Sequence, residues 1–137
     1  MKQQASKLAS QQVSARTRHF RDLLVWQRLI QLAKEVYRQT AALPKSEIFG
    51  LQSQMRRAAV SVPSNIAEGH GRLSDQLLRV FLAQARGSLC ELETQIQLCL
   101  DLEFLQNATV RELLELCNEV GRMINGLLKT LKPKDTK

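Results

Sequence analysis

The chain has 137 residues, 44% hydrophobic and 24% charged, which is typical of one globular domain with a substantial core. Six glycines and three prolines leave little room for the many turns of an all-β fold. The formal charge of +7 belongs to the ends, because residues 20–128 carry equal numbers of bases and acids and are neutral.

Residues 1–19 are rich in Gln, Ser and Ala and carry four bases and no acid. We interpret them as a basic mobile arm, because they lack the large apolar residues that a packed segment needs. A short basic tail is predicted at the other end, over residues 132–137. The segment 20–131 between them is expected to form the folded domain.

The first predicted helix is capped by Asp22 and stops at Leu43-Pro44, because a residue before proline avoids the α region. Apolar residues then recur at steps of three and four, which indicates one buried stripe. The expected stripe is Leu23, Trp26, Ile30, Ala33 and Tyr37, widened by Leu24, Leu29 and Val36.

The second predicted helix follows a cap at Ser46 and has Glu47 in its first turn. Its stripe is Ile48, Leu51, Met55, Ala58 and Val62. The apolar pattern continues beyond Pro63, so the helix is expected to bend there and to continue to about Glu68. Gly69 is then predicted to be its left-handed C-cap.

The third and fourth predicted helices carry the longest apolar patterns. The third begins at a Ser74 cap and runs for about 28 residues, with a stripe of Leu78, Leu82, Ala85, Leu89, Leu92, Ile96 and Cys99. The fourth begins with a Thr109–Glu112 capping box, and its stripe is Val110, Leu113, Cys117, Val120, Ile124, Leu127 and Leu131. A glycine in the middle of the third helix, at Gly87-Ser88, permits close helix approach, either inside the chain or between subunits.

Four amphipathic helices with three short connections predict an all-α fold, an antiparallel up-down-up-down four-helix bundle. An extended helical hairpin stabilised only by association is the alternative. The first and fourth helices carry more apolar residues than one core covers, which predicts self-association.

Several classes of function find no support in the sequence. The N-terminus has no apolar signal region, and no segment approaches the length of a membrane span. The three cysteines are expected to be reduced, as in a cytoplasmic protein, and they form no metal-binding pair. We find no nucleophile–base pair, phosphate loop or cofactor motif, so the chain is predicted not to be an enzyme and to need no cofactor.

Five arginines form the first candidate site. Arg72, Arg79 and Arg86 are seven residues apart on one helix face, and antiparallel pairing around the preceding turn is expected to bring Arg56 and Arg57 to the level of Arg86. Such a basic band predicts binding to the phosphates of RNA or DNA, indifferent to base sequence. The alternative is that these arginines form structural ion pairs across helices or between subunits.

The second candidate site lies at the end of the second helix. Asn65, Glu68 and His70 are predicted either to form a polar site there or to belong to a satisfied helix end. Neither reading supplies the ligand spacing of a metal site.

Three stretches resemble one bacterial family, "FRDLLVWQRLIQLAKEVYRQT", "GLQSQMRRAAVSVPSNIAEG" and "FLAQARGSLCELETQI". The family comprises four-helix bundles encoded in intervening sequences of 23S ribosomal RNA genes, and it is similar to the accessory protein of diversity-generating retroelements. The resemblance covers about residues 20–105. It implies a homo-oligomeric ring, commonly a pentamer, and through the retroelement protein it implies nucleic acid and a reverse transcriptase as partners.

The residues and the resemblance together predict a non-enzymatic, cytoplasmic homo-oligomer that acts as a nucleic-acid-binding or ribonucleoprotein accessory module. The alternative is a protein–protein scaffold whose arginines form structural ion pairs.

Overall fold

The structure, a computed structural model, describes residues 19–131, and the arm (except His19) and tail predicted from sequence lie outside this range. In the described part, four long helices follow one another: α2 (Leu24–Thr40), α3 (Leu51–Gly71), α4 (Asp75–Asp101) and α5 (Asn107–Thr130). Two short 3-10 helices, η2 (Phe20–Asp22) and η3 (Lys45–Glu47), precede α2 and α3.

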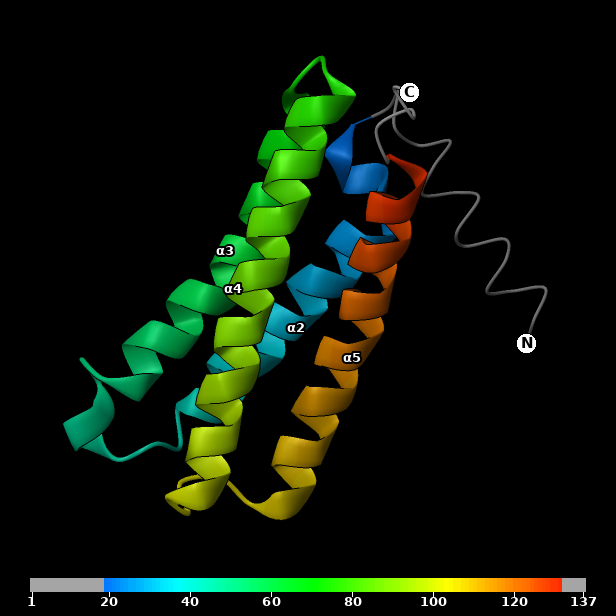
Figure 1. Cartoon of the computed structure of the whole chain (residues 1–137). Helices are drawn as coiled ribbons and strands as arrows, with labels where there is room; N and C mark the ends of the chain where they lie inside the picture. Colours follow the sequence, from blue (N-terminus) through cyan, green and yellow to red (C-terminus); the bar gives the residue numbers. More distant parts are fainter. Residues whose placement is uncertain (1–18, 132–137) are drawn as a thin grey trace.

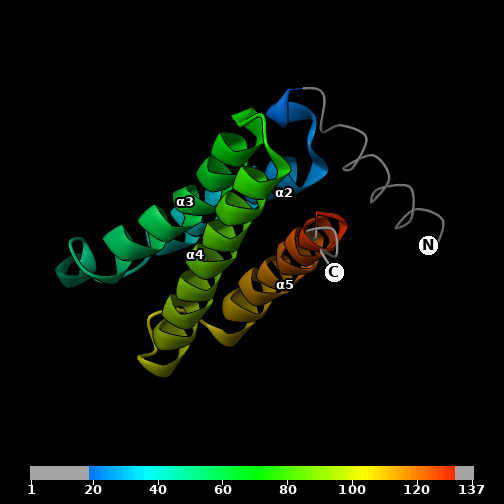
Figure 2. The same ribbon diagram turned by 45° about the horizontal axis from the view of Figure 1, so that its top comes forward.

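Consecutive helices run antiparallel, and α2 packs against both α3 and α5, which closes the bundle (Figures 1 and 2). The predicted all-α, up-down-up-down four-helix bundle is therefore confirmed. Both views show the first turns of α3 diverging from α4, so that the connection containing η3 protrudes from the bundle. Phe49 in this connection is almost fully exposed.

The core is one cluster to which all four helices contribute. On α4 every residue of the predicted stripe is buried, from Leu78 to Cys99. On α5 the predicted stripe is buried from Val110 to Ile124, while Leu127 and Leu131 are only partly buried against the core. The heptad pattern therefore identified the core faces of both helices, because each carries a single dominant apolar stripe.

The stripe predicted for the first helix lies mostly on the wrong face. The buried residues of α2 are Val25, Leu29, Leu32, Val36 and Thr40. Of the five residues of the predicted stripe only Leu23 is buried, and Tyr37 is 45% exposed, whereas Leu29 and Val36, predicted only to widen that stripe, are fully buried. Because α2 is apolar around much of its circumference, two neighbouring stripes satisfy the heptad rule, and only packing against α3 and α5 selects one of them.

The helix starts were predicted less well than the core. The Ser74 cap is confirmed, because its hydroxyl accepts a hydrogen bond from the Leu77 backbone N–H at 3.1 Å. The predicted Thr109–Glu112 box is wrong, because α5 already begins at Asn107 and has no side-chain cap.

The two earlier caps are also wrong. Asp22 ends η2, and α2 follows Leu23 without a side-chain cap. Ser46 lies inside η3, and the Glu47 carboxylate accepts a hydrogen bond from the Leu51 backbone N–H at 2.9 Å where α3 begins. Short polar residues suit 3-10 turns as well as helix caps, so their presence alone does not locate a helix start.

α3 continues through Pro63, as predicted, but it ends at Gly71, three residues beyond the predicted end at Glu68. The predicted left-handed cap at Gly69 is wrong, because no glycine in the described part of the chain has a positive φ. Gly69 is instead a buried helical residue at the contact between α3 and α4.

Candidate nucleic-acid interface

Arg56 holds the end of α2 against α3. Its guanidinium donates hydrogen bonds to the Thr40 hydroxyl at 2.9 Å and to the Tyr37 carbonyl at 3.1 Å. The same group lies over the Tyr37 ring, 4.6 Å from its centroid. Gln52 reinforces this contact by donating to the Thr40 carbonyl at 2.9 Å. Since two of its N–H donors and the face of its guanidinium contact α2, Arg56 has a structural role.

Arg57 is exposed and lies near Glu91 and Gln95 of α4, with which it lines a small groove. A hydrogen bond of 2.8 Å between the hydroxyls of Ser61 and Ser88 defines the local pairing of α3 and α4. Arg57 therefore lies about six residues, or roughly 9 Å, from the level of Arg86. The predicted alignment of these two arginines is wrong.

Arg72 lies at the turn between α3 and α4. Its guanidinium forms an ion pair of 2.6 Å with Glu68, one helical turn earlier, and lies 5.4 Å from the centre of the Phe81 ring. This arginine is thus partly neutralised by its own helix. The five arginines consequently do not form the continuous band that was expected.

Arg79 and Arg86 do lie together, in a groove of about 570 Å³ between α4 and α5. We call it the α4–α5 groove. Its lining residues are Gln76, Arg79, Val80, Ala83, Arg86, Asn125, Leu128 and Lys129. None of them is acidic, so within the described residues the groove wall carries three positive charges and no negative one.

Two details show how the groove presents its cations. The Arg86 guanidinium donates to the Asn125 side-chain carbonyl at 2.9 Å, which orients it without neutralising it. The Arg79 Nε is buried and has no hydrogen-bond partner in the described structure. A buried donor without a partner is costly, but this nitrogen is inaccessible and is not itself available to an anion in the groove.

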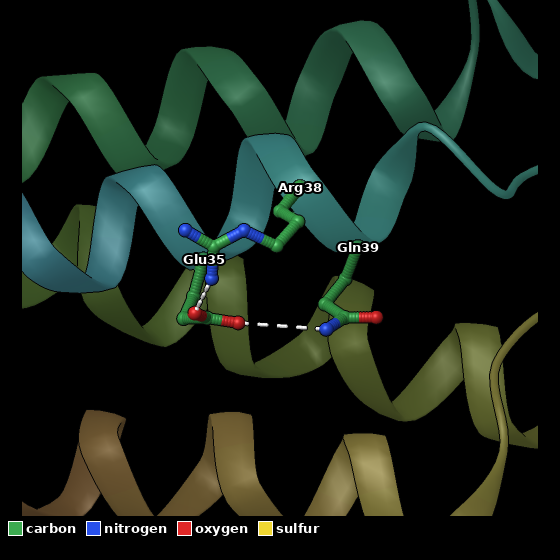
Figure 3. A network of polar contacts seen from close by, with 3 residues as sticks. All are labelled: Glu35, Arg38 and Gln39. Atoms are coloured by element: carbon green, nitrogen blue, oxygen red, sulfur yellow. Dashed lines mark hydrogen bonds and ion pairs between the residues drawn. The ribbon is translucent and has the colours of Figure 1, made fainter.

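Arg38 on α2 provides a contrast. Its guanidinium pairs with Glu35 one turn earlier, and Gln39 donates to the other carboxylate oxygen at 3.4 Å (Figure 3). The Glu35 carboxylate thus neutralises Arg38 locally. The positive charge of Arg38 therefore attracts a phosphate less strongly than the cations of the α4–α5 groove do.

Sequence reasoning missed Gln76, Asn125 and Lys129. Asn125 and Lys129 are four residues apart on one face of α5, a spacing visible in the sequence. The pairing of α4 with α5 would have placed them opposite Arg79 and Arg86. The sequence-based prediction of the basic band pairs only the second and third helices, so it does not include α5.

A comparison with family models matches residues 21–126 to one family, described as 23S rRNA-intervening sequence protein. The match covers most of the chain, including all of α2, α3 and α4. The chain belongs to the 23S rRNA-intervening sequence protein family. No curated protein sequence shows significant similarity to it.

The family region includes Arg79, Arg86 and Asn125, but it ends before Lys129. Most of the α4–α5 groove therefore belongs to the part of the chain that this 23S rRNA-intervening sequence protein shares with its family model. The last cation of the groove lies beyond that part.

The polar helix-end site is not assembled in this family member. The Asn65 side chain donates to the Ser61 carbonyl at 2.9 Å and to the Ser61 hydroxyl at 3.1 Å, so it belongs to the contact with Ser88. Glu68 pairs with Arg72. Both residues therefore belong to the α3–α4 side of the bundle.

His70 points elsewhere. It follows Arg56 and Pro63 at intervals of seven residues, which places it on the stripe of α3 that faces α2. Its Nε2 is buried without a hydrogen-bond partner in the described structure. Asn65, Glu68 and His70 thus do not converge on one site.

Metal-binding side chains are not grouped in the described residues, where no three His, Cys, Asp or Glu side chains come together. Burial raises the pKa of the Cys99 thiol to about 11 and that of Cys117 to about 12, with smaller contributions from Glu47 and Glu93 respectively. Both thiols therefore stay protonated at neutral pH, and both side chains pack in the hydrophobic core. None of the helices in the described range is long and apolar enough to cross a bilayer.

Proposed function

We propose that this protein is a non-enzymatic, cytoplasmic homo-oligomer that binds RNA or DNA through its phosphates. The observation that carries the proposal is the α4–α5 groove, whose described wall holds Arg79, Arg86 and Lys129 without an acid. Guanidinium and ammonium groups bind phosphate by charge-assisted hydrogen bonds, and they release counterions from the nucleic acid when they do so.

The lining of the groove also suggests which parts of a nucleic acid it contacts. It contains no aromatic side chain on which a base would stack. Its polar groups are cations and amides, which suit phosphate and sugar oxygens. We therefore expect binding that depends strongly on salt and hardly on base sequence. The 23S rRNA in the family name is not taken as the ligand, because the name describes an intervening sequence.

Self-association is the second part of the proposal. Large apolar side chains remain exposed on the single chain, including Ile48, Phe49, Leu73 and Leu102. Exposed apolar surface of this kind usually marks an interface. The family resemblance adds the expectation of five subunits and of a reverse transcriptase as a partner protein.

The groove is tested by replacing Arg79 and Arg86 together with Gln. Neither residue belongs to the buried stripe of α4, so the fold should be retained. Binding to unrelated RNA and DNA sequences should weaken about equally. The slope of log affinity against log salt concentration should fall by roughly one to two units.

The matched control replaces Arg38 and Arg111 with Gln, which removes the same charge away from the groove. This variant should bind nearly as well as the natural protein. If both double variants lose affinity equally, binding follows net charge and the groove is not its site. If neither loses affinity, the groove is not the binding site, and if the natural protein binds neither RNA nor DNA, the nucleic-acid proposal is wrong.

A protein–protein scaffold remains the second candidate function. A second groove, lined by Tyr37, Ile48, Gln52, Ser53, Arg56, Arg57, Val60 and Ser61, favours it. Tyr37, Ile48 and Val60 are each more than two-fifths exposed there, which suits a protein partner better than a phosphate. Dissociation of the oligomer by the Arg79→Gln, Arg86→Gln change, with nucleic-acid binding intact, would support the scaffold.

A further inference from the structure

Two partly apolar surfaces of the chain lie on either side of α3, which packs against both α2 and α4. The first is the second groove, a volume of about 610 Å³ where the end of α2 meets the first half of α3. Tyr37, Ile48 and Val60 in its lining are each more than two-fifths exposed. The second is the α4 leucine pair, Leu98 and Leu102, which are 43% and 52% exposed.

The two surfaces lie at the same level along the bundle. The hydroxyls of Ser61 and Ser88 are 2.8 Å apart, which sets the register of the antiparallel helices α3 and α4. The leucine pair, ten and fourteen residues after Ser88, is therefore level with the positions ten and fourteen residues before Ser61. Each of these positions is next to a residue of the second groove, Gln52 and Ile48 respectively. Copies related by rotation about an axis parallel to the bundle keep these levels, so the leucine pair of one copy can meet the groove of the next.

Gly87 lies on the same face of α4 as the leucine pair, because Leu98 follows it by eleven residues, about three helical turns. It is exposed in the middle of a 27-residue helix, where glycine is the least favourable residue after proline. A Cβ added to Gly87 would meet no atom of the chain within 4 Å, so packing inside the chain does not require glycine there. By the same register Gly87 is within two residues of the level of Val60 in the groove. A glycine at this point lets the neighbouring copy approach closely.

The charges of the two surfaces are opposite. The lining of the second groove includes Arg56 and Arg57 and no acidic residue. Around the leucine pair, residues 91–103 carry four acids and no base: Glu91, Glu93, Asp101 and Glu103. Contact between the groove of one copy and the leucine pair of the next therefore sets bases against acids, whereas groove against groove sets arginine against arginine.

The positions of the two surfaces determine the symmetry of such a contact. Each copy offers its groove to one neighbour and its leucine pair to the other, which makes the contact head-to-tail. Since the two surfaces flank α3 and are not back to back, each added copy is rotated relative to the last. Because their levels match, no copy is shifted along the axis. Repetition of the contact therefore closes into a ring and does not produce an open filament.

We propose that copies of this chain associate head-to-tail, with the α4 leucine pair of one copy packed in the second groove of the next. This contact rests on the proposed self-association and specifies its two surfaces. It is compatible with the five subunits expected from the family resemblance, because a head-to-tail contact does not require an even number. The contact uses the centre and the C-terminal half of α4, whereas the α4 residues of the α4–α5 groove extend only to Arg86. The nucleic-acid groove therefore stays open.

The contact is tested by replacing Leu98 with Gln. Removing an apolar side chain from the contact should raise the dissociation constant of the assembly by about tenfold or more. The matched control is Leu77→Gln, because Leu77 is also 43% exposed on α4 but lies near its other end, outside the contact. Neither leucine is buried and Gln is a good helix former, so circular dichroism should show both variants folded. Equal effects of the two changes on association would overturn the contact.

The head-to-tail direction is tested by disulfide formation in a Cys90→Ser background, in which the other cysteines are buried. Variants Ile48→Cys and Leu102→Cys should form a covalent dimer when they are co-expressed and oxidised. Neither should do so alone, because identical residues of neighbouring copies lie one subunit apart, too far for a disulfide. A chain that carries both changes should form covalent species larger than a dimer, whereas a twofold contact would stop at the dimer. A product that stops at the dimer, or no product from the co-expressed variants, would contradict the contact.

The mass of the natural chain by light scattering at micromolar concentration completes the test. A monomer would overturn the proposed self-association and the contact with it. An assembly that Leu98→Gln leaves unchanged would keep the self-association and overturn the contact alone. Nucleic-acid binding is measured separately, so its failure has no bearing on the contact.

Discussion

Arg56 and Arg57 are adjacent in the sequence, but only Arg56 is tied into the fold. Successive residues on a helix point about 100° apart, so Arg56 faces α2 and Arg57 faces outward. Arg56 satisfies the Thr40 hydroxyl, and Thr40 is fully buried. The same residue type therefore has two roles, and tertiary contacts decide which one applies.

We expect Arg56→Ala to lower the free energy of unfolding by about 1–2 kcal/mol, because it removes two charge-assisted hydrogen bonds and a ring contact. Arg57→Ala removes the same charge and should stay within about 0.5 kcal/mol of the natural protein. Urea denaturation of both variants measures the difference. Equal stabilities would show that Arg56 does not hold α2 to α3.

At the level of the elements, the closest fit in the bundle is between α3 and α4. A Cβ on Gly69 would lie 2.8 Å from the Phe81 Cβ and 3.0 Å from the Leu78 Cδ1, so these helices are close enough here to exclude any larger residue. Gly69 is therefore needed for the close contact between α3 and α4, and it does not terminate α3.

Gly69→Ala should therefore lower the free energy of unfolding by about 1–3 kcal/mol, because α3 and α4 must separate to admit the methyl group. Gly71→Ala is the matched control, since a Cβ there meets nothing within 4 Å. That change should be neutral or slightly stabilising. Thermal denaturation of both variants tests the contact, and a loss of stability confined to Gly71→Ala would refute it.

At the scale of the whole molecule, the charge and the fold occupy different parts of the chain. Segment 20–128 is neutral, and the excess of bases belongs to the ends. The bundle has no net charge, but its charges are unevenly distributed. Cations lie together in the α4–α5 groove, while the C-terminal half of α4 carries mainly acidic residues.

Deleting residues 1–18 removes four positive charges and no residue of the predicted stripes. We expect the melting temperature to change little and the nucleic-acid affinity to fall, with a smaller salt dependence. Filter binding at two salt concentrations, together with thermal denaturation, measures both effects. A large loss of thermal stability would contradict the mobile arm predicted from composition.

Sequence alone determined the all-α class, the family, the buried stripe of α4 and the buried stripe of α5 as far as Ile124. Long heptad patterns with one apolar face leave a single way to bury that face. The family predicted from the resemblance is the one whose model matches residues 21–126, because the resemblance rested on several motifs in order along the chain.

Only the tertiary structure decided which stripe of α2 enters the core, where α3 and α5 begin, and which arginines come together. Each of these depends on the pairing of helices that are distant in sequence. Arg79 and Arg86 acquire Asn125 and Lys129 as neighbours only because α5 returns along α4. Arg56 binds α2 and does not join them, because α2 packs beside α3. The helical period of a sequence carries no information about which helix lies next to it.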